Sequence, residues 1–170
     1  MPRLFCLVHI VLLLFFSNCS GKKEEPILPA YYVGQILFDP KKDDPDFYLC
    51  DKANILEHYQ TGTKYKEGTK SVRAYFAPLL KGLPERKGEN GTLTVRFIVN
   101  CKGGTGRFRL LGINRRYGLK TFSDELSETI LHAVKNMGCW TPGKYRGKIF
   151  DSYCTLNFKI KDGQVKDIFL

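Results

Sequence analysis

The sequence has few of the residues on which catalytic and metal sites depend. It holds three histidines, one tryptophan and two methionines among 170 residues. The histidines are His9, His58 and His132. Because they are dispersed, no Ser-His-Asp set and no pair of metal ligands follows from the pattern. The glycines within Lys102–Gly106 join two predicted strands and offer no helix N-terminus to a phosphate. We therefore predict no enzymatic activity, no cofactor and no metal.

Long apolar runs are also scarce. One run, Leu4–Phe16, follows Arg3 and is interrupted by His9. It is shorter than the about 20 residues that a helix needs to cross a bilayer, and its length is that of a signal-peptide core. We expect residues 1–18 to be a signal sequence that is removed. The alternative is a buried N-terminal helix.

Cys19 stands just after this run. The segment Leu14–Cys19 resembles a lipobox of the looser kind found in Bacteroidetes-like bacteria, in which the cysteine thiol receives the lipid. The resemblance implies a lipoprotein anchored at Cys19 in the cell envelope, on the periplasmic or the surface face of the outer membrane. Residues 19–60 are expected to form a polar tether and an extension of unknown role. Lys22–Glu25 resembles an acidic surface-export signal, and an ordinary polar spacer explains it equally well.

Acidic residues are outnumbered, because 17 Asp and Glu face 27 Lys and Arg, for a net charge of +10. Such a charge attracts acidic surfaces, including lipid headgroups. Nucleic acid would attract it too, but an exported protein is not expected to meet nucleic acid. The basic residues are scattered, so a basic surface without a specific ligand remains an open interpretation. We expect a protein partner and a membrane, and no nucleic acid.

Four cysteines remain after the signal sequence and the lipidated residue are set aside. They are Cys50, Cys101, Cys139 and Cys154. An even number in an oxidising compartment predicts two disulfides, for which three pairings are possible. No two of them have the close C-x-x-C spacing of zinc sites, so a bound zinc ion is not expected.

Hydrophobic periodicity predicts two helices. Apolar residues at helical spacing favour a helix over Thr69–Leu80, with Pro78 near its end. Ser123 is a candidate N-cap for a second helix, and Gly138 is its candidate stop. The apolar stripe of this second helix comprises Leu126, Ile130, Ala133, Val134 and Met137.

Period-two alternation predicts the strands. Residues 92–101 alternate as a half-buried strand, Lys102–Gly106 is the hairpin connection, and Arg107–Leu111 is the returning strand. Tyr153–Ile160 is the last strand of this set. Tyr31–Phe38 is a candidate short strand in the extension.

The element order helix, strand, strand, helix, strand predicts an α+β fold in residues 61–170. It is a two-layer sandwich in which two helices cover one face of an antiparallel sheet of three to four strands. A right-handed crossover places the last strand beside the first and antiparallel to it. Cys101 and Cys154 then share one face of neighbouring strands, which predicts a Cys101–Cys154 disulfide and leaves Cys50 to pair with Cys139.

The sequence from roughly residue 65 to residue 161 resembles a known family. The strand Gly91–Asn100, a helix ending Ala133–Met137, the turn Trp140–Gly143 and the strand Leu156–Ile160 are similar to the C-terminal domain of TonB proteins, particularly the Bacteroidetes-type versions. The Trp-x-Pro-Gly turn is the most specific part. In that turn Pro142 fixes a backbone angle and Gly143 permits positive φ, while Trp140 seals the helix end against the sheet. Trp140 is thus expected in the core, with a ligand platform as the alternative.

In that family the domain performs no chemistry. It binds the Ton box, a short extended segment of an outer-membrane transporter, by adding it to the edge of the last strand. The resemblance implies that the matching edge here comprises Tyr153, Cys154, Thr155, Leu156, Asn157, Phe158, Lys159 and Ile160.

Two features of the family are missing from this sequence, namely an inner-membrane helix and a long Pro-rich span. The sequence therefore favours an envelope lipoprotein whose TonB C-terminal-like domain binds an extended segment of a partner by strand addition. The partner is an outer-membrane transporter or another envelope protein. The alternative is an energy-transducing TonB-family protein in TonB-dependent transport across the outer membrane.

After the last predicted strand come Asp162 and Gly163, a strong signal for a tight hairpin. Val165–Leu170 is therefore expected to fold back along Tyr153–Ile160 and cover the edge that a partner strand would use. We predict that a chain ending at Lys161 binds extended peptides more tightly than the full chain.

Overall fold

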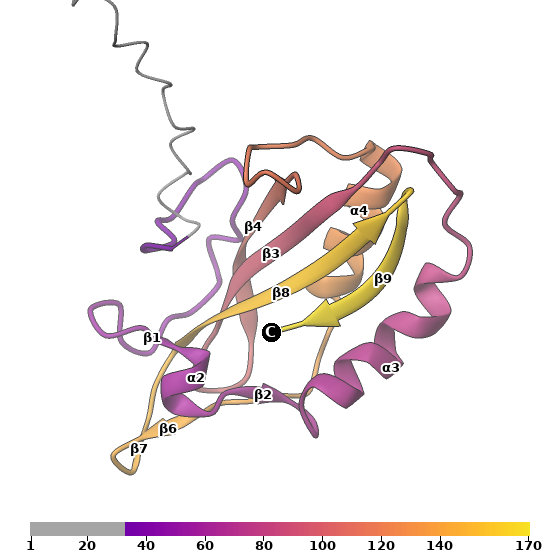
Figure 1. The fold of residues 1–170 in the computed structure, drawn as a ribbon. Helices are drawn as coiled ribbons and strands as arrows, with labels where there is room; N and C mark the ends of the chain where they lie inside the picture. The colour runs from indigo at the N-terminus through magenta and orange to yellow at the C-terminus, as the bar shows by residue number, and fades with distance from the viewer. Residues whose placement is uncertain (1–32) are drawn as a thin grey trace, which may run out of the picture.

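A twisted five-stranded sheet forms the centre of the computed structural model, which describes residues 33–170 (Figure 1). Its strands are β1 (Leu56–Glu57), β3 (Gly91–Val99), β4 (Thr105–Ile113), β8 (Ser152–Lys161) and β9 (Gln164–Phe169). β3 lies between β4 and β8, and both β1 and β9 pair with the other side of β8. β1 runs parallel to β8, whereas the remaining pairs are antiparallel. The α+β class is confirmed, but the sheet is mixed and has more strands than predicted.

Two helices pack on one face of this sheet. They are α3 (Thr69–Leu80) and α4 (Asp124–Lys135), and their buried residues join those of β3 and β8 in the main core. The predicted apolar stripe of α4 is buried throughout. Ser123 is its N-cap residue, but the serine side chain makes no capping hydrogen bond and contacts Glu89 instead. The helix ends at Lys135, before the predicted stop at Gly138. The left-handed backbone turn after α4 falls at Cys139, whose φ is 64°.

Short elements connect these parts. They are α2 (His58–Thr61), β2 (Lys64–Tyr65), β5 (Trp140–Thr141), β6 (Lys144–Tyr145) and β7 (Lys148–Ile149). β2 pairs with β5 and β6 pairs with β7, each antiparallel and outside the main sheet. The β2–β5 pair brings the start of α3 close to the turn that follows α4.

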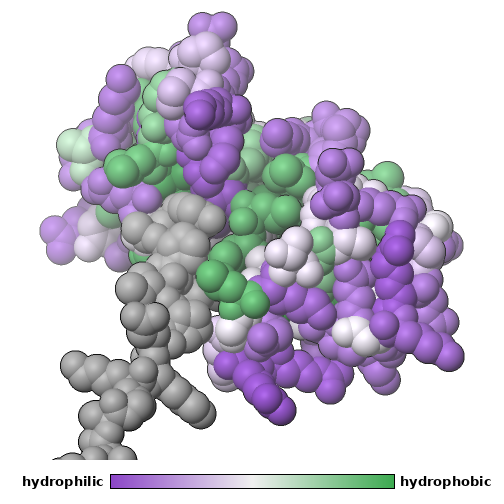
Figure 2. All heavy atoms as spheres, turned by 90° about the horizontal axis from the view of Figure 1, so that it is seen from above, coloured by the Kyte–Doolittle hydropathy of each residue, from purple (hydrophilic) through white to green (hydrophobic). Residues whose placement is uncertain are grey.

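The segment before β1 covers the second face of the sheet. Ile36 and Leu49 are buried there against Ile98 of β3 and Tyr153 of β8. β3 is therefore buried on both faces, although its alternation predicted a half-buried strand. Figure 2 shows hydrophobic side chains gathered near the middle of the face seen from above, with hydrophilic side chains around them.

Arginine side chains hold this segment in place of strand pairing. Arg96 donates to the carbonyl of Gly34, and Arg107 and Arg109 donate to the carbonyls of Ile36 and Leu37. Residues 33–38 form no strand, so the predicted short strand is wrong in its described part. Its first two residues lie outside the described residues. The carbonyls that a neighbouring strand would satisfy are bound by side chains of the sheet instead.

The disulfide joins Cys50 to Cys101, so both predicted pairings are wrong. Cys154 lies opposite Phe97 in the sheet register, whereas Cys101 lies beyond the end of β3. That offset of four residues corresponds to about 13 Å along a strand, while bonded cysteines have Cα atoms within about 7 Å. Cys139 is free and exposed, and Cys154 is free and buried.

Candidate functional site

The predicted binding edge on β8 is covered along most of its length. Tyr153 pairs with Glu57 of β1, and the stretch Asn157–Lys161 pairs with β9. Between these two neighbours, Cys154–Leu156 pairs with β3 alone among the described strands. The edge is therefore closed at both ends and lacks a strand partner only in this short interval.

β9 covers the edge by means of a tight hairpin. Lys161 pairs with Gln164 across the two-residue turn of Asp162 and Gly163. Both turn residues have positive φ, 50° and 78°, as a type I′ turn requires. This turn matches the right-handed twist of the strands, so the chain returns directly along β8. The predicted hairpin and the fold-back of the last residues are confirmed.

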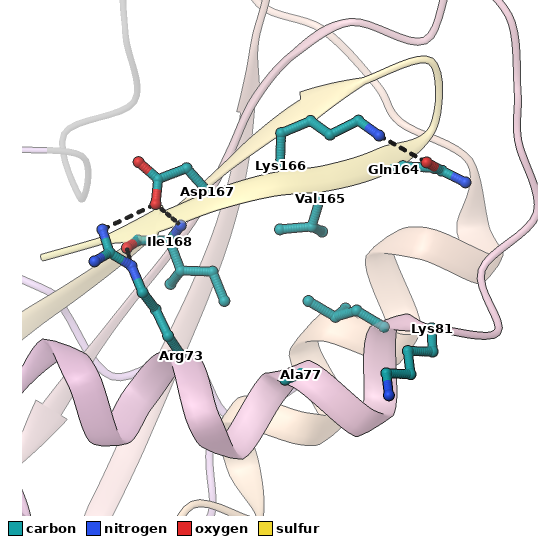
Figure 3. Close-up of a pocket in the computed structure, with 9 residues that line it drawn as sticks. Arg73, Ala77, Lys81, Gln164, Val165, Lys166, Asp167 and Ile168 are labelled. Atoms are coloured by element: carbon teal, nitrogen blue, oxygen red, sulfur yellow. Dashed lines mark hydrogen bonds and ion pairs between the residues drawn. The ribbon is translucent and has the colours of Figure 1, made fainter.

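A bulge at Lys166 determines which β9 side chains face the helices. Val165 pairs with Ile160, and Ile168 pairs with Phe158, with a register shift between these pairs. The extra residue shifts the alternation of β9 by one position, so Val165 and Ile168, three residues apart, both point toward α3 (Figure 3). Ile168 is 4% exposed and belongs to the main core. It is the principal apolar anchor of β9.

A groove of about 430 Å³ separates β9 from α3. α3 and the residue after it contribute Arg73, Ala77, Leu80 and Lys81 to its lining. Figure 3 shows Val165 and Ile168 reaching into the space between the strand and the helix. The groove runs alongside the free edge of β9, the place where a further strand would add to this side of the sheet.

Arg73 and Asp167 close that free edge. Arg73 donates from Nε to the Ile168 carbonyl at 3.1 Å and from a guanidinium NH₂ to Asp167 Oδ1 at 2.9 Å. Asp167 Oδ1 also accepts the Ile168 backbone N–H at 2.8 Å. Both backbone groups of Ile168 are thereby satisfied by side chains. We call these three residues the β9 clamp. Together with the bulge, the clamp blocks addition of a strand to the outside of β9.

Comparison with protein-family models, characterised proteins and solved structures finds no match. In the part of the chain that the structure describes, no helix is long and apolar enough to span a membrane. Cys19 and the predicted signal sequence lie outside the described residues.

The turn after α4 holds the other predicted residues. Trp140 is 5% exposed and packs against Tyr65 and Phe97, at ring-centroid distances of 5.5 and 5.2 Å. A ligand platform needs an accessible ring face, and burial denies Trp140 that role. Pro142 lies between Trp140 and Gly143 in sequence. Gly143 does not have positive φ, so that expectation was wrong; a glycine is needed there because the backbone lies against Thr61.

Hydroxyl groups that the sequence did not single out bind this turn to the sheet. Thr63 Oγ1 accepts the Gly143 N–H at 2.9 Å and donates to Ser152 Oγ at 2.8 Å. Thr61 Oγ1 lies 3.0 Å from the same Ser152 oxygen. These three hydroxyls are buried, and Ser152 is far in sequence from the two threonines, so no local pattern predicts their contact.

Among the described residues, one group of potential metal ligands gathers, namely Cys50, Cys101 and Asp151. The two sulfurs are bonded to each other, and Asp151 accepts the backbone N–H groups of Cys50, Asp51 and Cys101. The carboxylate thus stabilises the main chain around the disulfide.

Burial raises the pKa of the Cys154 thiol, which keeps that residue in its neutral form.

Proposed function

We propose that this domain binds an extended segment of a partner protein by strand addition to β8, and that β9 occupies the same edge until the partner displaces it. The observation that carries this proposal is the position of β9. It pairs over Asn157–Lys161, which includes half of the edge that the TonB-like resemblance assigns to a ligand. Main-chain hydrogen bonds supply the affinity in this mode of binding.

β9 is short enough to be displaced. It has six residues and pairs with one strand alone among the described strands, so few main-chain hydrogen bonds hold it to the sheet. The side chains of Arg73 and Asp167 are 54% and 48% exposed, so their ion pair contributes about 0.2–1 kcal/mol. Burial of Ile168 makes the largest single contribution to holding β9 in place, about 1.5–3 kcal/mol.

The interval Cys154–Leu156 offers an incoming strand a place to begin. It adjoins Asn157, which pairs with Phe169 at the end of β9. A partner segment can pair first with the interval and then replace β9 residue by residue. Each pair lost by β9 is compensated by a pair formed with the partner, so the edge is never fully exposed.

The test uses a full chain with a protease recognition sequence inserted between Asp162 and Gly163. The chain folds first and is then cut, which leaves β9 bound through its contacts alone. Labelled peptides from the N-terminal segments of outer-membrane transporters are titrated against the cut and uncut forms. We expect tighter binding to the cut form, because β9 no longer competes within the same chain.

A chain that ends at Lys161 gives the same comparison with β9 absent. It loses the buried Ile168, so its folding is checked by circular dichroism before any titration. Equal affinity of the peptides for the cut and uncut forms would show that β9 does not compete with a partner for β8. If neither form binds any transporter peptide, a partner of another kind is sought by crosslinking and co-purification in the native host.

We further propose that Cys19 carries a lipid anchor in the cell envelope. The apolar run that ends just before this residue supports the proposal. Cys19→Ala should abolish labelling by a palmitate analogue and release the protein into soluble fractions. Cys139→Ala serves as the matched control and should leave both results unchanged, since Cys139 is an exposed residue far along the chain.

A further inference from the structure

β9 occupies the part Asn157–Lys161 of this edge, and its side chains indicate which residues an added strand would need there. Two of its neighbouring residues carry the contacts. Asp167 meets the guanidinium group of Arg73, and Ile168 enters the core beside Phe158. The Phe158 ring in turn packs on Phe76 of α3, with ring centroids 4.9 Å apart.

The surface around β9 favours an acidic segment. The helix side of the groove carries Arg73 and Lys81 and no acidic residue. On β8, Lys159 and Lys161 are exposed where the strand pairs with β9. Asp167 is the one acidic residue in the groove lining, and it leaves with β9. Lys166 leaves with β9 as well, so displacement takes the carboxylate away from Arg73 while Arg73 and Lys81 stay on the helix side to meet another carboxylate.

The geometry of Arg73 also determines the position on the added strand at which a carboxylate can bind. The same guanidinium group binds the Asp167 side chain and the Ile168 carbonyl, at 2.9 and 3.1 Å. It therefore recognises an acidic residue only when the next backbone carbonyl faces α3. That condition defines one register of an added strand, since alternate residues of a strand face opposite sides.

We infer that the partner segment carries an acidic residue followed directly by an aliphatic residue, and that Arg73 selects this pair by binding the carboxylate and the next carbonyl. This inference depends on the strand-addition function proposed above. Arg73 is a specificity-determining residue in this scheme. The buried position of Ile168 selects a medium-sized aliphatic side chain at the second position.

The experiment uses the full chain cut between Asp162 and Gly163, as above, and measures its exchange with a labelled peptide of the sequence Gln164–Leu170. Three peptides are compared: the native sequence and the versions carrying Asp167→Asn or Ile168→Ser. The Asp167→Asn change should weaken binding about 1.5- to 5-fold, because the hydrogen bond to Arg73 loses the negative charge of the carboxylate. The Ile168→Ser change should weaken binding more than about 10-fold, because it replaces a buried aliphatic side chain with a small polar one.

A double-mutant cycle then assigns the effect to Arg73. In an Arg73→Gln protein the native and Asp167→Asn peptides should bind equally, and in an Arg73→Asp protein an Asp167→Arg peptide should bind better than the native one. Lys81→Gln is the matched control and should leave the preference for the native peptide intact. Lys81 lines the same groove and makes no ion pair with Asp167.

The outcomes separate this inference from the function on which it rests. If all three peptides exchange with equal affinity, strand addition stands and selection by Arg73 is refuted. If the Asp167 preference survives in the Arg73→Gln protein, another group reads the carboxylate and the inference is again refuted. If no peptide exchanges, strand addition at β8 fails and the inference fails with it.

Discussion

Cys50 and Cys101 form a disulfide that ties the N-terminal extension to the turn following β3. Their sequence separation is 51 residues, and their Cα atoms lie 6.1 Å apart. Asp151 strengthens this junction, because its carboxylate accepts the backbone N–H of each cysteine at 2.7 Å. The extension is thereby covalently attached to the sheet face that it covers.

Removal of this disulfide should destabilise the protein. We expect Cys101→Ser to lower the free energy of unfolding by about 2–4 kcal/mol, and reduction of the native protein should have a similar effect. Denaturant unfolding measures both. Cys139→Ser is the control and should cost little, since that thiol is free and exposed. Peptide mapping without reductant that joins Cys101 to any residue other than Cys50 would contradict the structure.

Gly143 should tolerate no larger residue. A Cβ atom there would lie 2.4 Å from the Thr61 carbonyl oxygen and 2.6 Å from Thr61 Cβ. Gly143→Ala should therefore cost about 1–3 kcal/mol of stability through overpacking. Gly138→Ala is the matched control, because nothing lies within 4 Å of a Cβ atom there. Thermal unfolding of the two variants decides the matter, and equal melting temperatures would argue against the close packing of this turn.

The buried ion pair of Asp43 and Arg109 should be essential for folding of the extension. Arg109 donates to both carboxylate oxygens of Asp43, at 2.6 and 2.7 Å, and both side chains are buried. Burial is the largest single influence on the pKa of Asp43 and raises it, but the hydrogen bonds from Arg109 and from the Asp39 backbone N–H, together with the nearby arginine charges, hold that pKa below its ordinary value. Asp43→Asn leaves Arg109 with a neutral acceptor and should cost about 3–5 kcal/mol.

Asp46→Asn is the control for this ion pair, because Asp46 is exposed in the same loop. It should leave the unfolding midpoint in urea unchanged. A loss of similar size in both variants would show that the loop, and not the ion pair, carries the effect.

His58 should make the protein less stable as the pH falls below neutrality. Burial lowers the pKa of His58 below its ordinary value, and its Nδ1 atom has no hydrogen-bond partner. The unfolded chain therefore takes up the proton first as the pH falls through about 6.5. Because the unfolded state then binds more protons than the folded state, the stability that neutral His58 provides is progressively lost.

The measurement is the free energy of unfolding between pH 7.5 and about 5.5, a range set by the ordinary histidine pKa. His58→Gln should remove the part of the decline that is due to this residue. His132→Gln, at an exposed position on α4, should retain it. If both variants decline as steeply as the native protein, another group controls stability in this range.

Local patterns were enough to predict the repeating elements. Helical spacing gave the bounds of α3, and the apolar stripe of α4 is buried as expected. Alternation predicted the hairpin of β3 and β4 and the strand β8. Asp162 and Gly163 predicted the return of β9, because a type I′ turn needs residues that accept positive φ. Each of these signals lies within a few neighbouring residues.

The cysteine pairing, the covering of the second sheet face and the closure of the candidate edge were decided by tertiary structure. The alternation of the strands indicated that Cys101 and Cys154 face the same side of the sheet. It could not indicate whether they lie opposite each other, because alternation does not determine the register between two strands. The arginines of β3 and β4 bind carbonyls of Gly34 and Leu37, contacts that no periodicity encodes. The β9 clamp likewise needs Arg73 beside Asp167. The sequence by itself determined which segments form helices, strands and the last hairpin, since these depend on neighbours along the chain. Only the tertiary structure decided which residues meet across the core, since that depends on how the elements pack in space.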